Sequence, residues 1–431
     1  MNPVVIIGGG PAGIASAAHL AERGVETVLI ERSKHLGGRA ASFFYSQMDE
    51  EVDYGQHVLM RCCTRSLDLL RLLGQEDAVS FQPSLHVPMR SETKRGKITS
   101  NPLPGALHLL PSLLAYRFLS LPARINAVRA GLSLLLQDPG DVSFGKWLSV
   151  HGQKERVIAT LWDPICVATL NARARDASAR MARLVFQRGF FRRHGADIGL
   201  FTRPLSQIFA SAIPYIESHQ GRVHLETPVN RIIVDRGRAH GVELASGEII
   251  EAHAIISAVP PHDLTPLLPS QQFLASLDRI AYAPIVNVHL WFDRSIMDEP
   301  FIIAIDSRIQ AVFDVSTAHR ERDKHHIVIS QSAATDWIDM PVASIVDISL
   351  SELRKLLPRG QRADLIDSLV IKSRFATFVP SPGAGALRPA TTTPIVGLFL
   401  AGDYTTTGWP STIEGAVRSG FSAAISLLAR R

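Results

Sequence analysis

The chain begins with an apolar run, a glycine-rich turn, a run of helical period and a second apolar run. These segments are contained in "VVIIGGGPAGIASAAHLAERGVETVLIERS", whose last three residues are Glu31, Arg32 and Ser33. Short apolar runs bounded by turns predict buried strands, and strands separated by a helix predict a parallel βαβ unit. The first part of the chain therefore predicts an α/β fold.

The end of the chain repeats this pattern once more, in "GLFLAGDYTTTGWPSTIEGAVRSGFSAA". Residues 397–401 predict a buried strand, and a helix is expected to open at Ser411 and Thr412. Ser411 and Glu414 have the spacing of a capping box. Helical-period apolar positions predict one buried face, made of Ile413, Ala416, Val417, Phe421, Ala424 and Ile425.

Between these ends, strand-like and helix-like segments alternate in a way that predicts two domains. Strand signals appear in "RVHLE", "NRIIVD", "HGVELA" and "AIISAVPP", and later in "IVNVHLWFD", "IQAVFDV" and "HHIVISQSA". The later three predict antiparallel strands that line a floor. We assign 1–74, 202–261 and 388–431 to one discontinuous domain, and 75–201 and 262–387 to an inserted α+β domain whose first half is leucine-rich and helical.

Alternation within "NVHLWFDR" assigns its side chains to two faces of a strand. Asn287, His289, Trp291 and Asp293 share one face, and Val288, Leu290 and Phe292 share the other. We interpret this segment as structural or as part of a tunnel wall.

Composition narrows the class of protein. The 431 residues are 46% apolar and 20% charged, with a formal net charge of +5, which permits an acidic membrane surface as partner. There is no basic arm, zinc-ligand spacing or RNA-binding aromatic signature, so we expect neither nucleic-acid binding nor a metal site. Cys62, Cys63 and Cys166 form no disulfide framework and are expected to be packed thiols in a reducing cytoplasm.

Two segments bear on membranes. Residues 103–121 approach the length of a membrane span, but two prolines, His108 and Arg117 argue against one, leaving a core or tunnel wall or a docking surface. Residues 173–194 place seven arginines among aromatic residues, which indicates a solvated helix face or docking on anionic lipid. Because the first apolar run passes straight into glycines, we expect no signal peptide. A cytoplasmic protein, peripheral to the inner face of the cell membrane, fits these features.

The glycines at the start of the chain have the spacing of a dinucleotide-binding turn. Gly8, Gly10 and Gly13 occupy the three positions of G-x-G-x-x-G, which serve a tight turn, close approach of a pyrophosphate and helix–strand packing. The following helix presents free N–H groups to phosphate. Glu31, eighteen residues after Gly13, favours an adenosine ribose over the 2′-phosphate of NADP.

Further turns favour FAD over NAD. Gly37, Gly38 and Arg39 supply a second turn with a cation, and Gly55, Gln56 and His57 supply a third. Asp403 is placed to accept hydrogen bonds from a ribityl or pyrophosphate group. The helix opening at Thr412 is expected to point at the flavin pyrimidine edge, where its dipole stabilises an anion by about 0.3–2 kcal/mol. With no cysteine near this terminal segment, we expect non-covalent FAD.

These motifs resemble the FAD-dependent amine oxidase and phytoene desaturase superfamily over nearly the whole chain. "APIVNVHLWFDRS", "ALRPATTTPIVGLFLAGDYT" and "STIEGAVRSG" resemble plant-type carotenoid desaturases. "WDPICVATLNARARDASA" and "GDYTTTGWPSTIEGAVRSG" are more similar to the bacterial hydroxysqualene dehydroxylases of hopanoid pathways, also called squalene-associated FAD-dependent desaturases.

The resemblance implies a discontinuous Rossmann-type FAD-binding domain with an inserted α+β domain that binds a long-chain isoprenoid. It also implies FAD contacts, which include Val229 of a strand–turn–strand that meets the adenine in this fold. The implied contacts are Gly8, Gly10, Ala12, Gly13, Glu31, Arg32, Gly38, Arg39, Val229, Gly402, Asp403 and Ile413.

We interpret the chain as an enzyme of the first of three functions, and the other two stay open as alternatives at this point. The first is reductive dehydroxylation of hydroxysqualene to squalene, in which an allylic cation left by loss of water takes hydride from reduced flavin N5. It needs a proton donor, for which His57 is the first candidate and Asp163 and Arg203 are further ones. The second is a carotenoid-type desaturase, which transfers hydride in the opposite direction to oxidised FAD. The third is an FAD-bound lipid carrier without catalysis.

Overall fold

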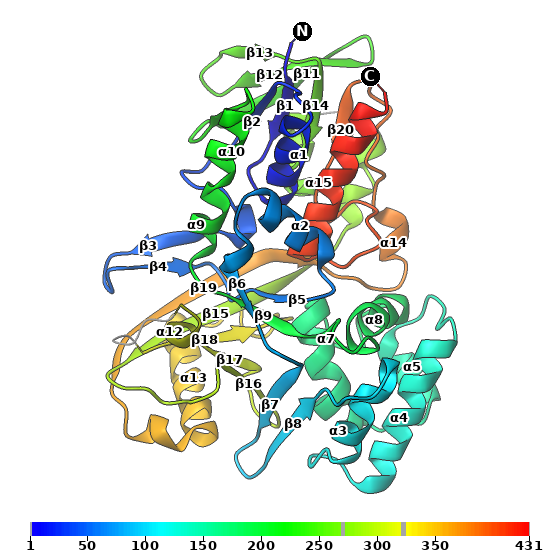
Figure 1. Cartoon of the computed structure of the whole chain (residues 1–431), viewed down its shortest axis with the longest axis vertical. Coiled ribbons are helices and arrows are strands. Elements are labelled where there is room, and N and C mark those ends of the chain that lie inside the picture. The colour runs from blue at the N-terminus through cyan, green and yellow to red at the C-terminus, as the bar shows by residue number, and fades with distance from the viewer. Residues whose placement is uncertain (1, 269–271, 320–324, 431) are drawn as a thin grey trace.

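The computed structural model describes residues 2–268, 272–319 and 325–430. A five-stranded parallel sheet occupies one end of the molecule, together with both chain termini (Figure 1). Its strand order is β10-β2-β1-β14-β20. The strands are β1 (Val4–Ile7), β2 (Thr27–Ile30), β10 (Arg222–His224), β14 (Ala254–Ser257) and β20 (Leu398–Leu400).

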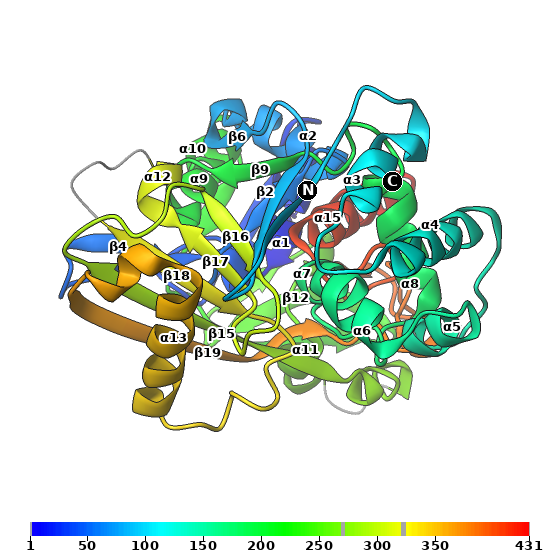
Figure 2. The same cartoon turned by 90° about the horizontal axis from the view of Figure 1, so that it is seen from below.

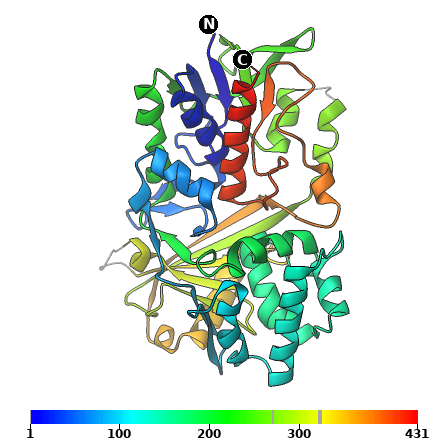
Figure 3. The same cartoon turned by 45° about the vertical axis from the view of Figure 1, so that its right-hand side comes forward.

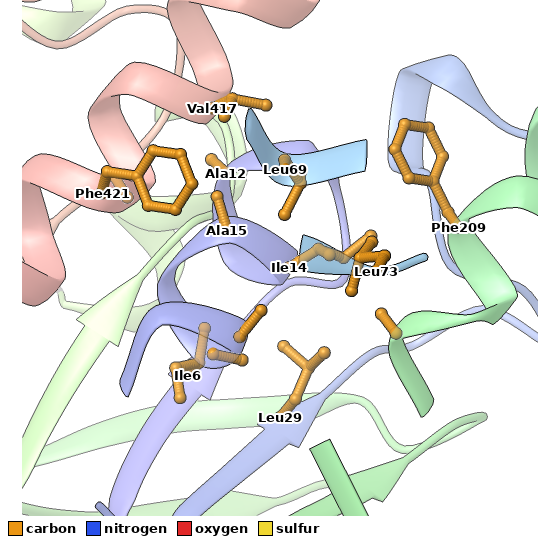
Figure 4. Close-up of a cluster of buried hydrophobic side chains, with 14 of the residues drawn as sticks. Ile6, Ala12, Ile14, Ala15, Leu29, Leu69, Leu73, Phe209, Val417 and Phe421 are labelled. Carbon is orange, nitrogen blue, oxygen red and sulfur yellow. The ribbon is translucent and has the colours of Figure 1, made fainter. Parts of the chain in front are cut away.

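Alternate side chains of these strands pack into two different cores, as the period of a strand requires. Val4, Ile6 and Leu29 face a core with α1 (Pro11–Ala21) and α15 (Ile413–Leu428) (Figure 4). Val5 and Ile7 face the other core, on the side of a three-stranded antiparallel sheet. The elements beside these cores are α2 (Thr64–Leu72), α9 (Leu205–Ala210), α10 (Ala212–Ser218), β11 (Val229–Asp235), β12 (Arg238–Leu244), β13 (Ile249–Glu251) and α11 (Pro261–Leu267).

A second, seven-stranded sheet lies below the parallel sheet (Figure 1) and has the order β19-β15-β18-β17-β16-β7-β8. Its pairs are antiparallel except for β16 with β7. The predicted antiparallel strands are therefore confirmed. The strands are β7 (His86–Arg90), β8 (Arg95–Thr99), β15 (Tyr282–Phe292), β16 (Phe301–Ala304), β17 (Ala311–Asp314), β18 (His326–Gln331) and β19 (Leu365–Phe378).

Helices gather beside this sheet, as Figure 2 shows from below. They are α3 (Leu110–Leu114), α4 (Leu121–Leu136), α5 (Phe144–Val150), α6 (Glu155–Val157), α7 (Asp163–Leu170) and α8 (Ala179–Val185). Further elements are α12 (Val315–His319), α13 (Val342–Leu356), α14 (Ala384–Leu387), β3 (Ser42–Tyr45), β4 (Glu50–Asp53), β5 (Val58–Met60), β6 (Val79–Phe81) and β9 (Ile198–Phe201). The parallel sheet draws its strands only from the segments assigned to the FAD domain; the exact boundaries stay a prediction.

The strand β15 has the two faces that its sequence predicts. Val288, Leu290 and Phe292 are buried in the core beneath the seven-stranded sheet. On the other face, His289 Nδ1 lies 2.9 Å from His326 Nε2, and Trp291 Nε1 donates to Glu50 Oε1 at 2.5 Å. Asp293 lies beyond the strand end and is exposed, so the predicted face stops at Trp291.

The segment 103–121 is not one continuous helix. It contains a 3₁₀ turn at Gly105–Leu109 and the short α3, separated from α4 by residues 115–120. Tyr116 and Phe118 are buried in the helical core, and His108 is a buried polar residue of the same segment. No helix among the described residues is long and apolar enough to cross a membrane.

The helix α15 forms where the sequence predicts it, but its first turn differs. Thr412 is the N-cap, and its hydroxyl accepts from the Gly415 N–H at 3.1 Å. The predicted capping box is therefore wrong, because the Ser411 hydroxyl donates to Asp403 instead. Ile425 is exposed rather than buried, since small residues at 420, 423 and 424 form the closest part of the face.

Candidate cofactor and substrate site

One cavity of about 1340 Å³ is lined by residues of both large sheets and of the helical region. Pockets for a single small ligand measure about 300–1,000 Å³, so this cavity has room for a large cofactor and a second molecule. Polar and glycine-rich segments line one part of it, and aliphatic and aromatic side chains line the other.

The cofactor part begins at the turn between β1 and α1. Gly8 has a φ of +101°, a conformation that favours glycine. Gly10 is the N-cap of α1 and has no side chain to cap it, and the first turn, including Ala12, lines the cavity. An uncapped helix N-terminus that opens on a cavity is a ready anion site, so these residues fit the pyrophosphate of FAD.

Eleven of the twelve predicted FAD contacts line this cavity, and Gly13 does not. A Cβ at Gly13 would lie 1.8 Å from the Gly8 carbonyl oxygen, so its place is to let α1 pack against the turn. A Cβ at Gly10 would meet nothing closer than the Gly38 Cα, at 3.9 Å. Gly10 thus leaves free space between two glycine turns, as the approach of a pyrophosphate requires.

Glu31 follows β2 and is nearly fully buried. Its two carboxylate oxygens accept from the Gly9 N–H at 2.6 Å and the Ser33 N–H at 2.8 Å. The carboxylate therefore fixes the glycine turn as well as lining the cavity. Arg32 pairs with Asp263 at 3.0 Å, at the edge of the same cavity.

Asp403 joins the two ends of the chain at the cavity wall. Its carboxylate accepts from the Arg39 guanidinium and the Ser411 hydroxyl. Arg39 also donates to the Ala376 carbonyl at 2.8 Å. These three contacts bring a turn near residue 39, strand β19 and the terminal loop together.

Arg388 stabilises the terminal loop through hydrogen bonds to residues 403–409. It is not among the site residues predicted from the sequence. It donates to the carbonyls of Asp403 and Trp409 and to the Thr407 hydroxyl, at 2.8–2.9 Å. Burial lowers the pKa of its guanidinium to about 10. No local motif marks Arg388, because its partners lie 15–21 residues away.

The first turn of α15 lies close to the start of α2. The buried Glu414 carboxylate accepts from the Ser66 N–H at 2.8 Å and the Ser66 hydroxyl at 2.9 Å. Cys62 and Cys63, just before α2, line the cavity together with Glu414. The expectation that no cysteine lies near the terminal flavin segment is therefore wrong, because folding brings together residues that are distant in the sequence. Non-covalent FAD stays a prediction.

The substrate part is an apolar chamber. Its lining comes from β5, β7, β16, α7 and the segment after α8, and includes Met60, Met89, Ile165, Val167, Phe190, Phe301 and Ile303. Polar residues that also line the cavity include Asn171, Asn287 and Gln331. No residue of 103–121 lines it, so that segment belongs to the helical core rather than to a tunnel.

His57 and Asp163 line the cavity, whereas Arg203 does not. Arg203 instead pairs with Asp77 at 3.0 Å and donates to Gln75, so it is not in place to act as an acid there. Burial lowers the pKa of His57, and its Nδ1–H donates to the Gly55 carbonyl at 2.6 Å. Neutral His57 consequently offers Nε2 as an acceptor.

Comparison with known proteins identifies the family to which a chain with this site belongs. The sequence profile of the family described as flavin containing amine oxidoreductase matches residues 11–428. The chain belongs to this family. Its residues also fit the cofactor that the family implies, so the protein is an FAD-dependent oxidoreductase.

Two relatives of different activity have the same sequence identity to this chain. A 15-cis-phytoene desaturase of Synechococcus elongatus is 26% identical, over 99% of this chain and 96% of that protein. A hydroxysqualene dehydroxylase of Sinorhizobium fredii is also 26% identical, over 98% of this chain and 97% of that protein. Sequence identity alone therefore does not separate the two activities.

Solved structures share the fold. An oxidoreductase from Methanosarcina mazei is similar with a TM-score of 0.77 and 20% identity, covering 97% of this chain and 99% of that one. Putrescine oxidase bound to putrescine gives a TM-score of 0.73 at 17% identity, covering 100% and 99%. The predicted α/β architecture is confirmed.

Substitutions at Gly10 and Gly13 are expected to separate cofactor binding from packing. Gly10→Ala keeps the stability of the apoprotein, because φ is −76° and the added Cβ has room. It should weaken FAD binding by ~10-fold or more, equal to ~1.4 kcal/mol. Gly13→Ala should lower apoprotein stability itself by about 1–3 kcal/mol.

The measurements are thermal unfolding of the two apoproteins and titration with FAD. Unchanged FAD affinity of the Gly10→Ala protein would contradict the placement of the pyrophosphate.

Proposed function

We propose that the protein carries out FAD-dependent reductive dehydroxylation of hydroxysqualene to squalene. The observation that carries the proposal is the single cavity in which a cofactor part continues into an apolar chamber. A long hydrocarbon with one hydroxyl group matches such a chamber, because most of its surface is apolar and few polar groups are needed to orient it.

The sequence segment that forms part of the chamber wall favours dehydroxylation. Residues 162–179 are one of the two segments that resemble hydroxysqualene dehydroxylases, and part of it lines the cavity: Asp163, Pro164, Ile165, Val167, Ala168, Thr169, Asn171 and Arg173. The Asp163 carboxyl group in that wall suits the loss of a hydroxyl group, because the departing oxygen needs a proton. Hydride removal from a hydrocarbon needs no such proton donor.

The roles of the chain's own residues follow from their contacts. When bound, reduced FAD supplies a hydride. Glu31 and Val229 are proposed to hold the adenosine end, the turn at Gly10 and Gly38 the pyrophosphate, and Asp403 with Arg39 the ribityl region. His57 is proposed to contact the substrate hydroxyl as a hydrogen-bond acceptor at Nε2, because Gly55 already takes its Nδ1 proton.

A carotenoid-type desaturase is the alternative, since the same cavity and the similarity to 15-cis-phytoene desaturase support it. It reverses the direction of hydride transfer. A lipid carrier that binds FAD without catalysis would share the cavity but show no turnover.

An anaerobic single turnover tests the proposal. Photoreduced enzyme mixed with hydroxysqualene in detergent should reoxidise its flavin and form one squalene per FAD. Flavin absorbance and product mass are the measurements, and oxidised enzyme with phytoene is the matched control. Bleaching of oxidised enzyme by phytoene, with reduced enzyme inert to hydroxysqualene, would replace dehydroxylation by desaturation; inertness to both would leave the carrier.

The surface of residues 103–136 supports a membrane-peripheral location, which we include in the proposal. Exposed apolar side chains gather there, and those of α4 recur at positions that share one helix face. Residues 101–137 contain three arginines and no acidic residue. The exposed apolar side chains are Leu103, Leu107, Leu114, Leu121, Ile125, Leu132 and Leu136.

The double variant Leu121→Gln, Leu136→Gln should bind anionic vesicles ~10-fold or more weakly, because burial of two leucines contributes at least ~1.4 kcal/mol. Sedimentation with vesicles of phosphatidylglycerol and phosphatidylcholine measures the effect. Val150→Gln is the matched control, since Val150 and Leu136 are both 77% exposed but Val150 lies on α5. Equal vesicle binding by all three proteins would refute this surface.

A further inference from the structure

The proposed reaction needs a proton donor in the cavity, and most of the acidic side chains that line it are held by other groups. Glu31 accepts two backbone N–H groups, Asp403 and Glu414 accept from arginine and hydroxyl groups, and Asp263 and Asp306 pair with arginines. Asp163 differs. Among the residues that the structure describes, only the Ala174 N–H bonds to it, at Oδ1 and 2.7 Å.

The backbone before Asp163 is irregular for a reason that its sequence explains. Residues Ile158–Trp162 form a turn of π-helix, closed by the Asp163 N–H on the Ile158 carbonyl. Pro164 has no N–H for the Thr160 carbonyl, which accepts from the Tyr116 hydroxyl instead. π-helical turns frequently occur at functional sites, and this one places Asp163 at the cavity wall.

Apolar residues of its own helix lie beside the Asp163 carboxyl group at the cavity wall. Ala159, Pro164 and Val167 line the cavity beside it along the same helix. The charged groups that act on it are Arg173, Arg175 and Asp176, with the thiol of Cys166 also close. Arg173 and Arg175 are exposed and directed at least partly to solvent.

We propose that Asp163 is the catalytic residue that donates the proton to the departing hydroxyl group. This inference rests on the proposed function. The carboxyl O–H bond breaks as its proton joins the substrate oxygen, and the allylic C–O bond breaks to release water. Reduced FAD, when bound, would supply the hydride for the new C–H bond of squalene and would itself be oxidised, and Asp163 remains a carboxylate until it regains a proton from solvent.

The directions of the pKa shifts of Asp163 and His57, the two candidate proton donors in the cavity, agree with this assignment. Desolvation raises the pKa of Asp163, against the opposing effects of the Ala174 N–H, Arg173 and Arg175. Burial lowers the pKa of His57, which is the unfavourable direction for an acid. A carboxyl group in an apolar wall thus keeps its proton to higher pH, whereas His57 loses its proton more readily.

The isosteric variant Asp163→Asn is the first test, because its amide oxygen still accepts from the Ala174 N–H. The single-turnover rate should fall about 10²–10⁴-fold, with substrate affinity nearly unchanged. The wild-type rate should decline as pH rises through the Asp163 pKa, and this decline should be absent in Asp163→Asn. Asp163→Glu should recover part of the rate.

A matched control and a second readout exclude a purely structural role. Asp53 is another carboxyl group whose pKa burial raises, to about 6, but it does not line the cavity. Asp53→Asn should keep the wild-type rate and pH profile. Infrared spectra of the oxidised enzyme, recorded over a pH series, should contain a protonated-carboxyl band that titrates with the Asp163 pKa and that Asp163→Asn lacks, whether or not substrate is turned over.

The outcomes separate this inference from the proposed function. Wild-type turnover with an unimpaired Asp163→Asn variant overturns the role of Asp163 alone. Equal loss of rate in the Asn and Glu variants, or loss of substrate binding in Asp163→Asn, also overturns it, since that result indicates positioning. A wild-type enzyme that carries reduced flavin but never converts hydroxysqualene overturns both.

Discussion

The close crossing of α1 and α15 is the contact on which the cofactor site depends. A Cβ at Gly420 would lie 2.1 Å from the Ala12 carbonyl oxygen, so only glycine permits this approach. The Ser16 hydroxyl bonds to the Gly420 carbonyl at 3.0 Å, across 404 residues of sequence. Figure 3 shows the two helices side by side. Because they touch, the first turn of each helix opens on the same cavity.

The cavity is divided by the physical character of its walls. Charged and hydrogen-bonded groups hold the glycine turn and the terminal loop in place, through Glu31, Arg388 and Glu414. The chamber beyond is built from aliphatic and aromatic side chains of separate elements. A polar cofactor and an apolar chain can therefore meet in one cavity, where exclusion of water by the bound molecules would strengthen electrostatic interactions and protect the cationic intermediate of the proposed reaction.

The sequence alone predicted the features that depend on the spacing of residues within a short segment. The turn at Gly8, the strand ending at Leu400 and the alternating faces of β15 each follow from a short pattern, and all three are present. Features that depend on distant partners were missed or misplaced. The Ser411 hydroxyl bonds to Asp403 instead of capping a helix, and Arg203 pairs with Asp77 away from the cavity. The approach of Cys62 to α15 depends on the packing of α2, which no local pattern reveals.

Transfer of a hydride from the cofactor to the carbon that loses its hydroxyl group is the central claim. It is tested most directly by reconstituting the apoprotein with reduced 5-deaza-FAD in which both hydrogens at C5 are deuterium, a position that does not exchange with water. One turnover with hydroxysqualene should yield squalene with one deuterium, at the carbon that bore the hydroxyl group. Squalene formed without deuterium would contradict the account.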